Sequence, residues 1–301
     1  MFPIIEAKLL KYFIDMAKAV TKKVNKPQHQ QRPGKESLMQ PSPVSDEQKP
    51  LSEKLKNKVL FITGGDSGIG KAVSILFAKE GANIAIVYLS ETLDATDTKN
   101  HIESYGRECF LIKGDISKEK FCKAAIQKTI EQYGKIDILI NNAGLHYETK
   151  HAEDINIRKM KKTFEVNIFS MFYLVKYALP HLKKGACIIN TSSVTAYRGS
   201  PYLMDYAATK GAIVSFTRSL AINLVKKGIR VNGVAPGPIW TPLIASSFNK
   251  TRVAEHGSQT PMERAGEPVE VAPAYLFLAC DDSSYISGQF IHPNGGEIIN
   301  G

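Results

Sequence analysis

The feature that most constrains this chain is an apolar run that leads through a glycine-rich turn into a helical pattern. Residues Val59–Thr63 are the apolar run, which predicts a short buried strand. Gly64, Gly68 and Gly70 stand in the turn, and a helical pattern follows from residue 71 to Gly81. This order aims backbone N–H groups and a helix N-terminus at a diphosphate, and glycines let the phosphates approach closely. The sequence therefore predicts a dinucleotide-binding unit.

The sequence of this turn also fits two other interpretations. Residues 65–71 also fit the first positions of a P-loop, with Lys71 at the lysine position. A P-loop needs Ser or Thr next to ligate magnesium, but Ala72 stands there. A tight turn that binds no ligand is the remaining alternative, and the motifs further along the chain disfavour it.

Strand-like runs recur along the rest of the chain, separated by helical patterns of ordinary length. They lie near residues 58–63, 83–88, 109–114, 136–141, 186–191, 230–235 and 289–292. This alternation predicts an α/β fold, a doubly wound parallel sheet (Rossmann fold) with right-handed crossovers. We expect a single catalytic domain over residues 58–301, preceded by an extension over residues 1–57.

Polar and small residues follow several predicted strands where each one ends. Asp115 closes the third run and could hold an adenine amino group, and Ser193 closes the fifth. Asn167 lies inside a helical stretch. Ligands of open parallel sheets bind outside the carboxyl ends of the strands. Alone, Asp115 could be a cap and Asn167 could fill a helix bend, but together these residues indicate a site.

Tyr206 and Lys210 are four residues apart in a helical run, so their side chains share one helix face. A tyrosine titrates near pH ~10, and an adjacent ammonium favours its phenolate. The phenol could then exchange a proton with an alcohol or carbonyl oxygen that the Ser193 hydroxyl holds. One such Tyr–Lys pair is expected by chance among 12 tyrosines, so the combination with the glycine turn carries the inference.

With these motifs the chain resembles the classical short-chain dehydrogenases/reductases over about residues 55 to 300. The matching residues are Thr63, Gly64, Gly68, Gly70, Asn141 to Gly144, Asn167, Ser193, Tyr206, Lys210, Pro236 and Gly237. Within that family the segments 63–70, 193–199 and 235–243 are similar to the bacterial general stress proteins and glucose/ribitol-type dehydrogenases.

The resemblance implies hydride transfer on NAD or NADP. It makes Tyr206 the acid/base, Lys210 the residue that binds the nicotinamide ribose and keeps Tyr206 acidic, Ser193 the group that orients the substrate, and Asn167 the holder of a proton-relaying water. The cofactor-binding residues that it implies are Thr63, Gly64, Asp66, Ser67, Gly68, Ile69, Gly70, Tyr88, Leu89, Asp115, Ile116, Asn142, Ala143, Gly144, Tyr206, Lys210, Pro236, Gly237, Ile239 and Thr241. The family also implies a homo-oligomer, commonly a tetramer.

The substrate should lie between Ser193, Tyr206 and the segment 240–262. That segment contains Leu243, Phe248 and His256, and its lone arginines, Arg252 and Arg264, are expected to face water. The mixture favours a small uncharged alcohol, polyol, sugar or aldehyde. A 3-oxoacyl thioester remains the alternative, since reductases of that class share the catalytic residues. A non-catalytic dinucleotide sensor is disfavoured, because such relatives usually lose the Tyr, Lys or Ser.

The choice between NAD and NADP is left open, with NAD favoured on balance. NAD enzymes usually place an acidic residue at the end of the second strand, and NADP enzymes a basic one. Here the strand continues into Tyr88, Leu89 and Glu91, with neither an aspartate at its tip nor an arginine in the turn. Asp66 would repel a 2′-phosphate if it pointed inward.

The first 58 residues contain 12 Lys/Arg against 6 Asp/Glu, which is +6 of the total net charge of +10. The remaining +4 does not suggest a nucleic-acid surface. Prolines predict an extended arm over residues 25–50, and the resemblance implies that this arm lies across a neighbouring subunit. Residues 1–24 have an amphipathic pattern, so weak contact with a membrane surface is an open alternative. Their charges exclude a secretory signal.

Composition completes these expectations. No apolar run approaches the length of a membrane span. The four cysteines are widely spaced, which favours reduced thiols in the cytoplasm and no metal site. His146, just after Gly144, could line the substrate pocket, but a solvated loop histidine is the favoured interpretation.

Overall fold

The seven apolar runs form the seven strands of one parallel sheet in the computed structural model, which describes residues 25–45 and 52–299. The strands are β1 (Val59–Thr63), β2 (Asn83–Tyr88), β3 (Cys109–Lys113), β4 (Ile138–Asn141), β5 (Cys187–Thr191), β6 (Arg230–Val234) and β7 (Phe290–Ile291). Each matches its predicted run to within two residues or so. The doubly wound α/β prediction is confirmed.

The strand order is β3-β2-β1-β4-β5-β6-β7, and every neighbouring pair is parallel. The chain moves outward in one direction from β1 to β3 and then returns to the other side of β1 with β4. In such sheets the connections that leave the carboxyl ends of the two central strands run to opposite faces of the sheet. This leaves a crevice between them, where ligands bind. The glycine turn after β1 and the loop after β4 lie at this point.

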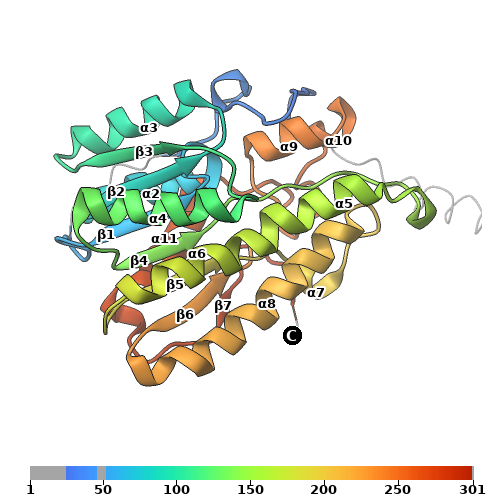
Figure 1. The fold of residues 1–301 in the computed structure, drawn as a ribbon. Coiled ribbons are helices and arrows are strands. Elements are labelled where there is room, and N and C mark those ends of the chain that lie inside the picture. The colour runs from blue at the N-terminus through green and yellow to red at the C-terminus, as the bar shows by residue number, and fades with distance from the viewer. Residues whose placement is uncertain (1–24, 46–51, 300–301) are drawn as a thin grey trace, which may run out of the picture.

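Helices cover both faces of the sheet (Figure 1). One face packs on α2 (Gly68–Lys79), α3 (Thr92–Ser104) and α11 (Pro268–Ala279), and the other on α4 (Glu119–Tyr133), α6 (Ser170–Ala178) and α8 (Met204–Leu224). Successive side chains of β1 alternate between these two cores, because Leu60 and Ile62 join the first and Phe61 the second. Burial on both faces explains why the central strand β1 is apolar up to Thr63 at its end.

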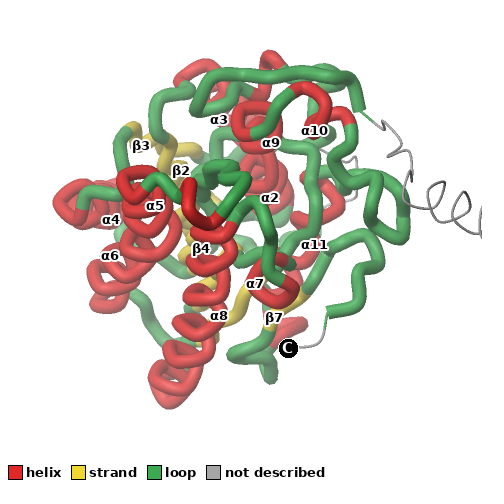
Figure 2. Tube along the Cα trace, turned by 90° about the vertical axis from the view of Figure 1, so that its right-hand side faces the viewer, coloured by secondary structure: helices red, strands yellow, loops and turns green. Residues whose placement is uncertain are grey.

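Shorter helices gather at the carboxyl ends of the strands. They are α5 (Ile157–Phe164), α7 (Thr195–Arg198), α9 (Pro242–Ser247) and α10 (Lys250–Ala254). Figure 2, which looks onto that end, shows it built largely of loops around these helices. A scaffold of this kind holds a site on loops that a rigid sheet positions.

The amino-terminal arm, of which residues 25–45 are described, packs against its own chain. It contains a single 3-10 turn (Glu36–Leu38) and is otherwise extended. Its backbone bonds to the segment 240–256: Asn25 N donates to Ala254 O at 2.9 Å and Gln30 N to Ala245 O at 2.8 Å. These bonds place this stretch on its own chain, and its implied contact with a neighbouring subunit stays a prediction. The amphipathic pattern of residues 1–24 lies outside the described residues.

Among the described residues, no helix is both long enough and apolar enough to cross a membrane. The four cysteines are buried and form no disulfide with one another. Burial raises the pKa of the Cys109 and Cys187 thiols to about 12, so both remain protonated.

Candidate active site

A cavity of about 1830 Å³ lies at the carboxyl ends of the strands, roofed by α9, α10 and the loops around them. It extends from the glycine turn past the end of β2 at one side to Ser193 and Tyr206 at the other. A cavity of ~300–1,000 Å³ suits a drug-sized ligand. The larger volume found here suits a dinucleotide together with a substrate.

The glycine turn needs its glycines for steric reasons. Gly64 and Gly68 have φ of 63° and 53°, which lie in the left-handed region. A β-carbon on Gly70 would lie 1.8 Å from the carbonyl oxygen of Gly64. Thr63 Oγ1 accepts hydrogen bonds from the N–H groups of Asn142 and Ala143, both at 3.1 Å, and so ties this turn to the loop after β4.

Most of the residues implied for the cofactor line the cavity. They are Gly64, Asp66, Ser67, Gly68, Ile69, Tyr88, Leu89, Asp115, Ile116, Asn142, Ala143, Gly144, Tyr206, Lys210, Pro236, Gly237, Ile239 and Thr241. Thr63 and Gly70 do not line it but shape the turn from beneath. The roles of all these residues stay predictions.

A carboxylate from the arm caps the helix that follows the glycine turn. Glu36 Oε2 accepts the N–H of Gly68 at 2.6 Å, and its Oε1 lies 2.7 Å from the Nζ of Lys71. Glu36 is 5% exposed and Lys71 is 8% exposed. A negative charge at a helix N-terminus is favourable, so this contact fastens the arm to the cofactor turn. The sequence does not predict this contact, and its one signal is a lysine in a helix turn that is expected to be buried.

Acidic side chains gather beside the glycine turn and the end of β2. Burial, together with the nearby Glu91 and Asp94, raises the pKa of Asp66 to about 7. Glu91 folds back to accept hydrogen bonds from the N–H and hydroxyl of Ser90, both at 2.9 Å. Asp66 and Glu91 both line the cavity, so this end of it is acidic.

Asp115 has the cap role that the sequence left open and also lines the cavity. Its Oδ1 accepts the N–H of Ser117 at 2.9 Å, and its Oδ2 pairs with Lys162 Nζ at 2.9 Å. Burial acts to raise the pKa of Asp115, but Lys162 and Ser117 outweigh it, so the pKa lies below its ordinary value. Asp115 is therefore ionised near neutral pH.

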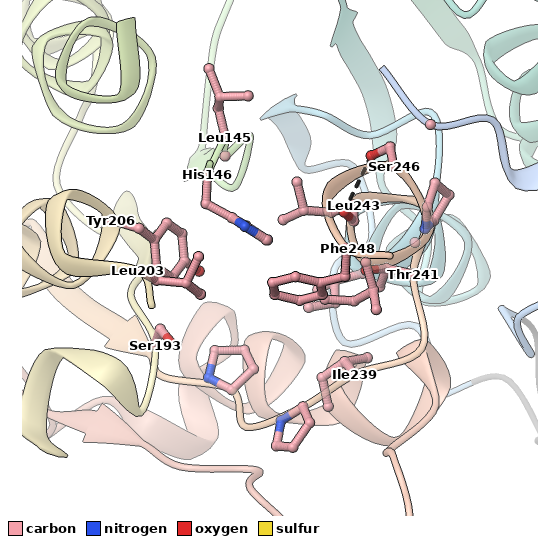
Figure 3. Close-up of a pocket in the computed structure, with 18 of the residues that line it drawn as sticks. Leu145, His146, Ser193, Leu203, Tyr206, Ile239, Thr241, Leu243, Ser246 and Phe248 are labelled. Carbon is pink, nitrogen blue, oxygen red and sulfur yellow. Dashed lines mark hydrogen bonds between the residues drawn. The ribbon is translucent and has the colours of Figure 1, made fainter. Parts of the chain in front are cut away.

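Tyr206, Lys210 and Ser193 come together at the other side of the cavity. The first two lie one turn apart on α8, as their spacing predicts, and Ser193 follows β5. Lys210 Nζ lies 5.3 Å from the centre of the Tyr206 ring and donates a hydrogen bond to Thr191 O at 2.8 Å. Ser193 lies near Tyr206 on the same wall (Figure 3).

The buried surroundings oppose charge on both titratable groups of this trio. Burial raises the pKa of Tyr206 to about 12, although its interaction with Ser193 lowers it. Burial lowers the pKa of Lys210 to about 7. Tyr206 is therefore a protonated phenol at neutral pH, ready to donate a proton, and Lys210 titrates in the physiological range.

These pKa values predict opposite pH profiles for the two directions of an alcohol–carbonyl reaction. Reduction needs the Tyr206 proton and the Lys210 charge, so its kcat/KM should fall as the pH rises through about 7. Oxidation needs Tyr206 to accept a proton, so its kcat/KM should rise with pH. Initial rates in both directions test this, and Lys210→Arg, which keeps the charge, should remove the fall near pH 7. A reduction profile that does not change through that pH would contradict the assignment.

Asn167 lies beneath the trio in a π-helical turn (Glu165–Phe169), a local distortion that often marks functional sites. Its Oδ1 accepts the N–H of Leu145, and its Nδ2 donates to Leu145 O, both at 2.8 Å. Nδ2 also donates to Thr209 Oγ1 at 3.1 Å. The side chain is completely buried and does not line the cavity. Its implied role in holding a water stays a prediction, but its contacts show that it fixes the loop after Gly144.

His146, the next residue of that loop, lies in the pocket wall. The favoured interpretation of a solvated histidine is wrong, since the side chain is only 2% exposed. Its ring lies 5.1 Å from the ring centres of both Tyr206 and Phe248 and points into the pocket (Figure 3). Burial, followed by nearby cations, lowers the pKa of His146 to about 3, so the ring is neutral.

The remaining walls of this part of the cavity are mainly apolar. Leu203 lies beside Tyr206, and Ile239 and Leu243 lie on the other side of the pocket (Figure 3). Arg252 pairs with Glu148 and stacks 4.3 Å from the Phe248 ring centre, so the expectation that it simply faces water is corrected. Arg264 pairs with Glu270 at the surface.

The arm supplies a cation that the sequence analysis did not assign to the site. Arg32 lies 4.0 Å from the ring centre of Tyr147 and lines the cavity. Gly34, two residues after Arg32, packs so tightly that a β-carbon there would lie 2.3 Å from Pro242 O. The arm is therefore part of the cavity wall.

Comparison with known proteins identifies similar chains. Residues 64–297 match a family described as "Enoyl-(Acyl carrier protein) reductase". "General stress protein 39" of Bacillus subtilis (strain 168) is 53% identical, over 89% of this chain and 94% of that protein. "NADPH-dependent aldehyde reductase 1, chloroplastic" of Arabidopsis thaliana is 51% identical, over 91% and 97% of the two chains. A crystal structure from Brucella melitensis, described as "Short-chain dehydrogenase/reductase SDR:Glucose/ribitol dehydrogenase", superposes with a TM-score of 0.73 at 35% identity, covering 82% of this chain and 99% of that one.

Proposed function

The chain belongs to the short-chain dehydrogenase/reductase family, and from this premise we propose that it interconverts a small alcohol, polyol or sugar and its carbonyl compound by hydride transfer. The observation that carries the proposal is the single cavity that joins the glycine turn to Ser193, Tyr206 and Lys210. The glycine turn and a candidate acid/base group thus line the same cavity.

The residues present fit a nicotinamide dinucleotide. Gly64 and Gly68 have left-handed backbone in the turn, and the absence of side chains at these positions would let a diphosphate approach the backbone closely. Ser67 to Ile69 would hold the diphosphate, Asp66 and Leu89 would lie along the adenosine, and Lys210 would bind the nicotinamide ribose. When bound, the dinucleotide supplies or takes up the hydride.

The chain's own residues would then bind the oxygen of the substrate and exchange a proton with it. The Ser193 hydroxyl would donate a hydrogen bond to a carbonyl oxygen placed beside the Tyr206 hydroxyl. Tyr206 would give its proton to that oxygen in reduction and take it back in oxidation. Lys210, when protonated, would stabilise the phenolate that reduction leaves on Tyr206.

The walls around Tyr206 favour a small substrate with few charges, because Leu203, Ile239, Leu243 and Phe248 supply mainly carbon surface. The relative named as an aldehyde reductase supports an aldehyde. A 3-oxoacyl thioester is the second candidate, and the description of the matching family supports it only as far as an acyl group on a carrier protein.

Steady-state assays of the full chain test the function. Polyols, sugars, short aldehydes and acetoacetyl thioesters should be offered with each dinucleotide. We expect turnover of at least one uncharged alcohol–carbonyl pair. Failure to bind either dinucleotide in a fluorescence titration would overturn the proposal, and exclusive use of the thioester would replace it with the second candidate.

For the cofactor we favour NAD over NADP. Glu91 lines the cavity beside the end of β2, where its carboxylate would repel a 2′-phosphate, and Asp66, whose pKa is raised to about 7, would add to this repulsion in its ionised form. The relative named NADPH-dependent supports the opposite choice. The ratio of kcat/KM for NAD to that for NADP decides, and a ratio well below one would reject NAD.

We also propose that the protein works in the cytoplasm with reduced cysteines, and that it is a homo-oligomer, a tetramer by family resemblance. The support for an oligomer comes from exposed apolar side chains on two neighbouring helices. Phe172 on α6 is 50% exposed and stacks on Phe216 of α8, while Ile222 on α8 is 79% exposed. Light scattering would measure the subunit number, and a monomer at micromolar concentration would contradict the proposal.

A further inference from the structure

His146 is a buried polar side chain for which the protein provides no hydrogen-bond partner. It is 2% exposed, and neither ring nitrogen bonds to any described residue. Nδ1 is completely enclosed. A buried polar group of this kind costs on the order of 1–3 kcal/mol unless something satisfies it. Such exceptions need an explanation.

The position of the ring is fixed rather than accidental. Asn167 holds both backbone polar groups of the preceding residue, Leu145, at 2.8 Å. Tyr206 and Phe248 hold the imidazole between them, with each ring centre 5.1 Å away. An aromatic contact alone could be made by phenylalanine at no polar cost.

The ring can act as a hydrogen-bond donor toward the pocket. A neutral imidazole carries one N–H and one lone pair. Because Nδ1 is enclosed without an acceptor, a proton there would leave a buried N–H unpaired. The proton therefore belongs on Nε2, the ring nitrogen left to meet a ligand. This follows from the enclosure of the ring and does not depend on titration.

The neighbours of the His146 ring determine which oxygen of a substrate could accept a hydrogen bond from it. The reacting oxygen belongs beside Tyr206 and Ser193, and His146 packs edge-on against the Tyr206 ring. A group bound to the carbon next to the reacting one would therefore lie near His146. The wall opposite, with Leu243 and Phe248, offers mainly carbon surface to the rest of the molecule.

We propose that His146 is a specificity-determining residue that donates a hydrogen bond from Nε2 to a hydroxyl oxygen on the carbon adjacent to the reacting C–O group. The preferred substrates are then 2-hydroxy aldehydes or ketones and the vicinal diols to which they are reduced. This inference rests on the proposed reductase function, which it narrows to one substrate class.

The test compares glycolaldehyde with propanal, which have the same number of heavy atoms and differ by one hydroxyl. The wild-type chain should have the higher kcat/KM for glycolaldehyde. His146→Phe should lower that preference, measured as the ratio of kcat/KM for glycolaldehyde to that for propanal, by on the order of tenfold, since one hydrogen bond is worth about 1.4 kcal/mol. His146→Gln keeps a donor and should restore part of the preference.

The outcomes distinguish a failure of the role of His146 from a failure of the proposed reductase function. If the wild type turns over neither aldehyde with either dinucleotide, the reductase function fails for this class. If it turns over both and His146→Phe leaves their ratio unchanged, only the role of His146 is overturned. Circular dichroism and thermal melting of each variant identify a misfolded one, and His146→Gln then supplies the comparison.

Discussion

Tyr206→Phe is expected to lower kcat for carbonyl reduction by about 10²–10⁴-fold, the range typical for loss of a general acid. The phenyl ring keeps the contact with His146 but has no proton to give to the substrate oxygen. Binding of the dinucleotide should change little, because Lys210 supplies the predicted ribose contact and keeps its bond to Thr191 O. Steady-state rates and a fluorescence titration of the dinucleotide measure the two quantities separately.

Two further variants test whether the loss of turnover can be separated from the loss of dinucleotide binding. Ser193→Ala should lower kcat while leaving the dinucleotide affinity unchanged, as for Tyr206→Phe. Lys210→Met should weaken dinucleotide binding as well as turnover. Wild-type turnover by Tyr206→Phe would remove the acid/base role from Tyr206 and with it the mechanism proposed here.

Glu36→Ala should produce the largest loss of stability expected from one change in the arm. It leaves Lys71 buried with only the half-exposed Asp97 as a partner, 2.8 Å away. Breaking a buried ion pair in this way costs about 3–5 kcal/mol. The bond to the Gly68 N–H is lost as well. Urea unfolding should therefore show a lower midpoint, and dinucleotide affinity should fall because the turn loses its support.

Lys35→Ala is the matched control, since Lys35 is the exposed neighbour of Glu36 in the same arm. It should leave both the unfolding midpoint and the affinity near their wild-type values. The double variant Glu36→Gln/Lys71→Met removes both charges and should recover much of the stability. Equal losses from Glu36→Ala and Lys35→Ala would show that the buried pair does not hold the arm.

The fold could be predicted from the sequence because its signals are local. Each strand is an apolar run that parallel packing buries on both faces, and the glycine turn has a steric requirement that only glycine meets. The spacing of Tyr206 and Lys210 likewise fixes a shared helix face. These features depend on neighbours within a few residues, so the printed sequence displays them directly.

The features that the sequence did not reveal depend on contacts between distant segments. Glu36 meets Lys71 only because the arm folds back over the glycine turn. His146 is buried because Phe248, about a hundred residues later, covers it. No periodicity in the sequence encodes contacts between residues so far apart in the chain. The arm's composition predicted an extended backbone but could not specify which surface it would follow.

The arm lies outside the part of the chain that carries the family motifs but inside the part that lines the cavity. Every recognisable motif lies after residue 58, yet Arg32 lines the cavity and Trp240 Nε1, in the roof segment, donates a hydrogen bond to Pro41 O at 2.9 Å. A chain shortened to residues 58–301 would keep every motif of the family but lose one side of its cavity wall. The segment that the family model matches, residues 64–297, is therefore smaller than the part of the chain that lines the cavity.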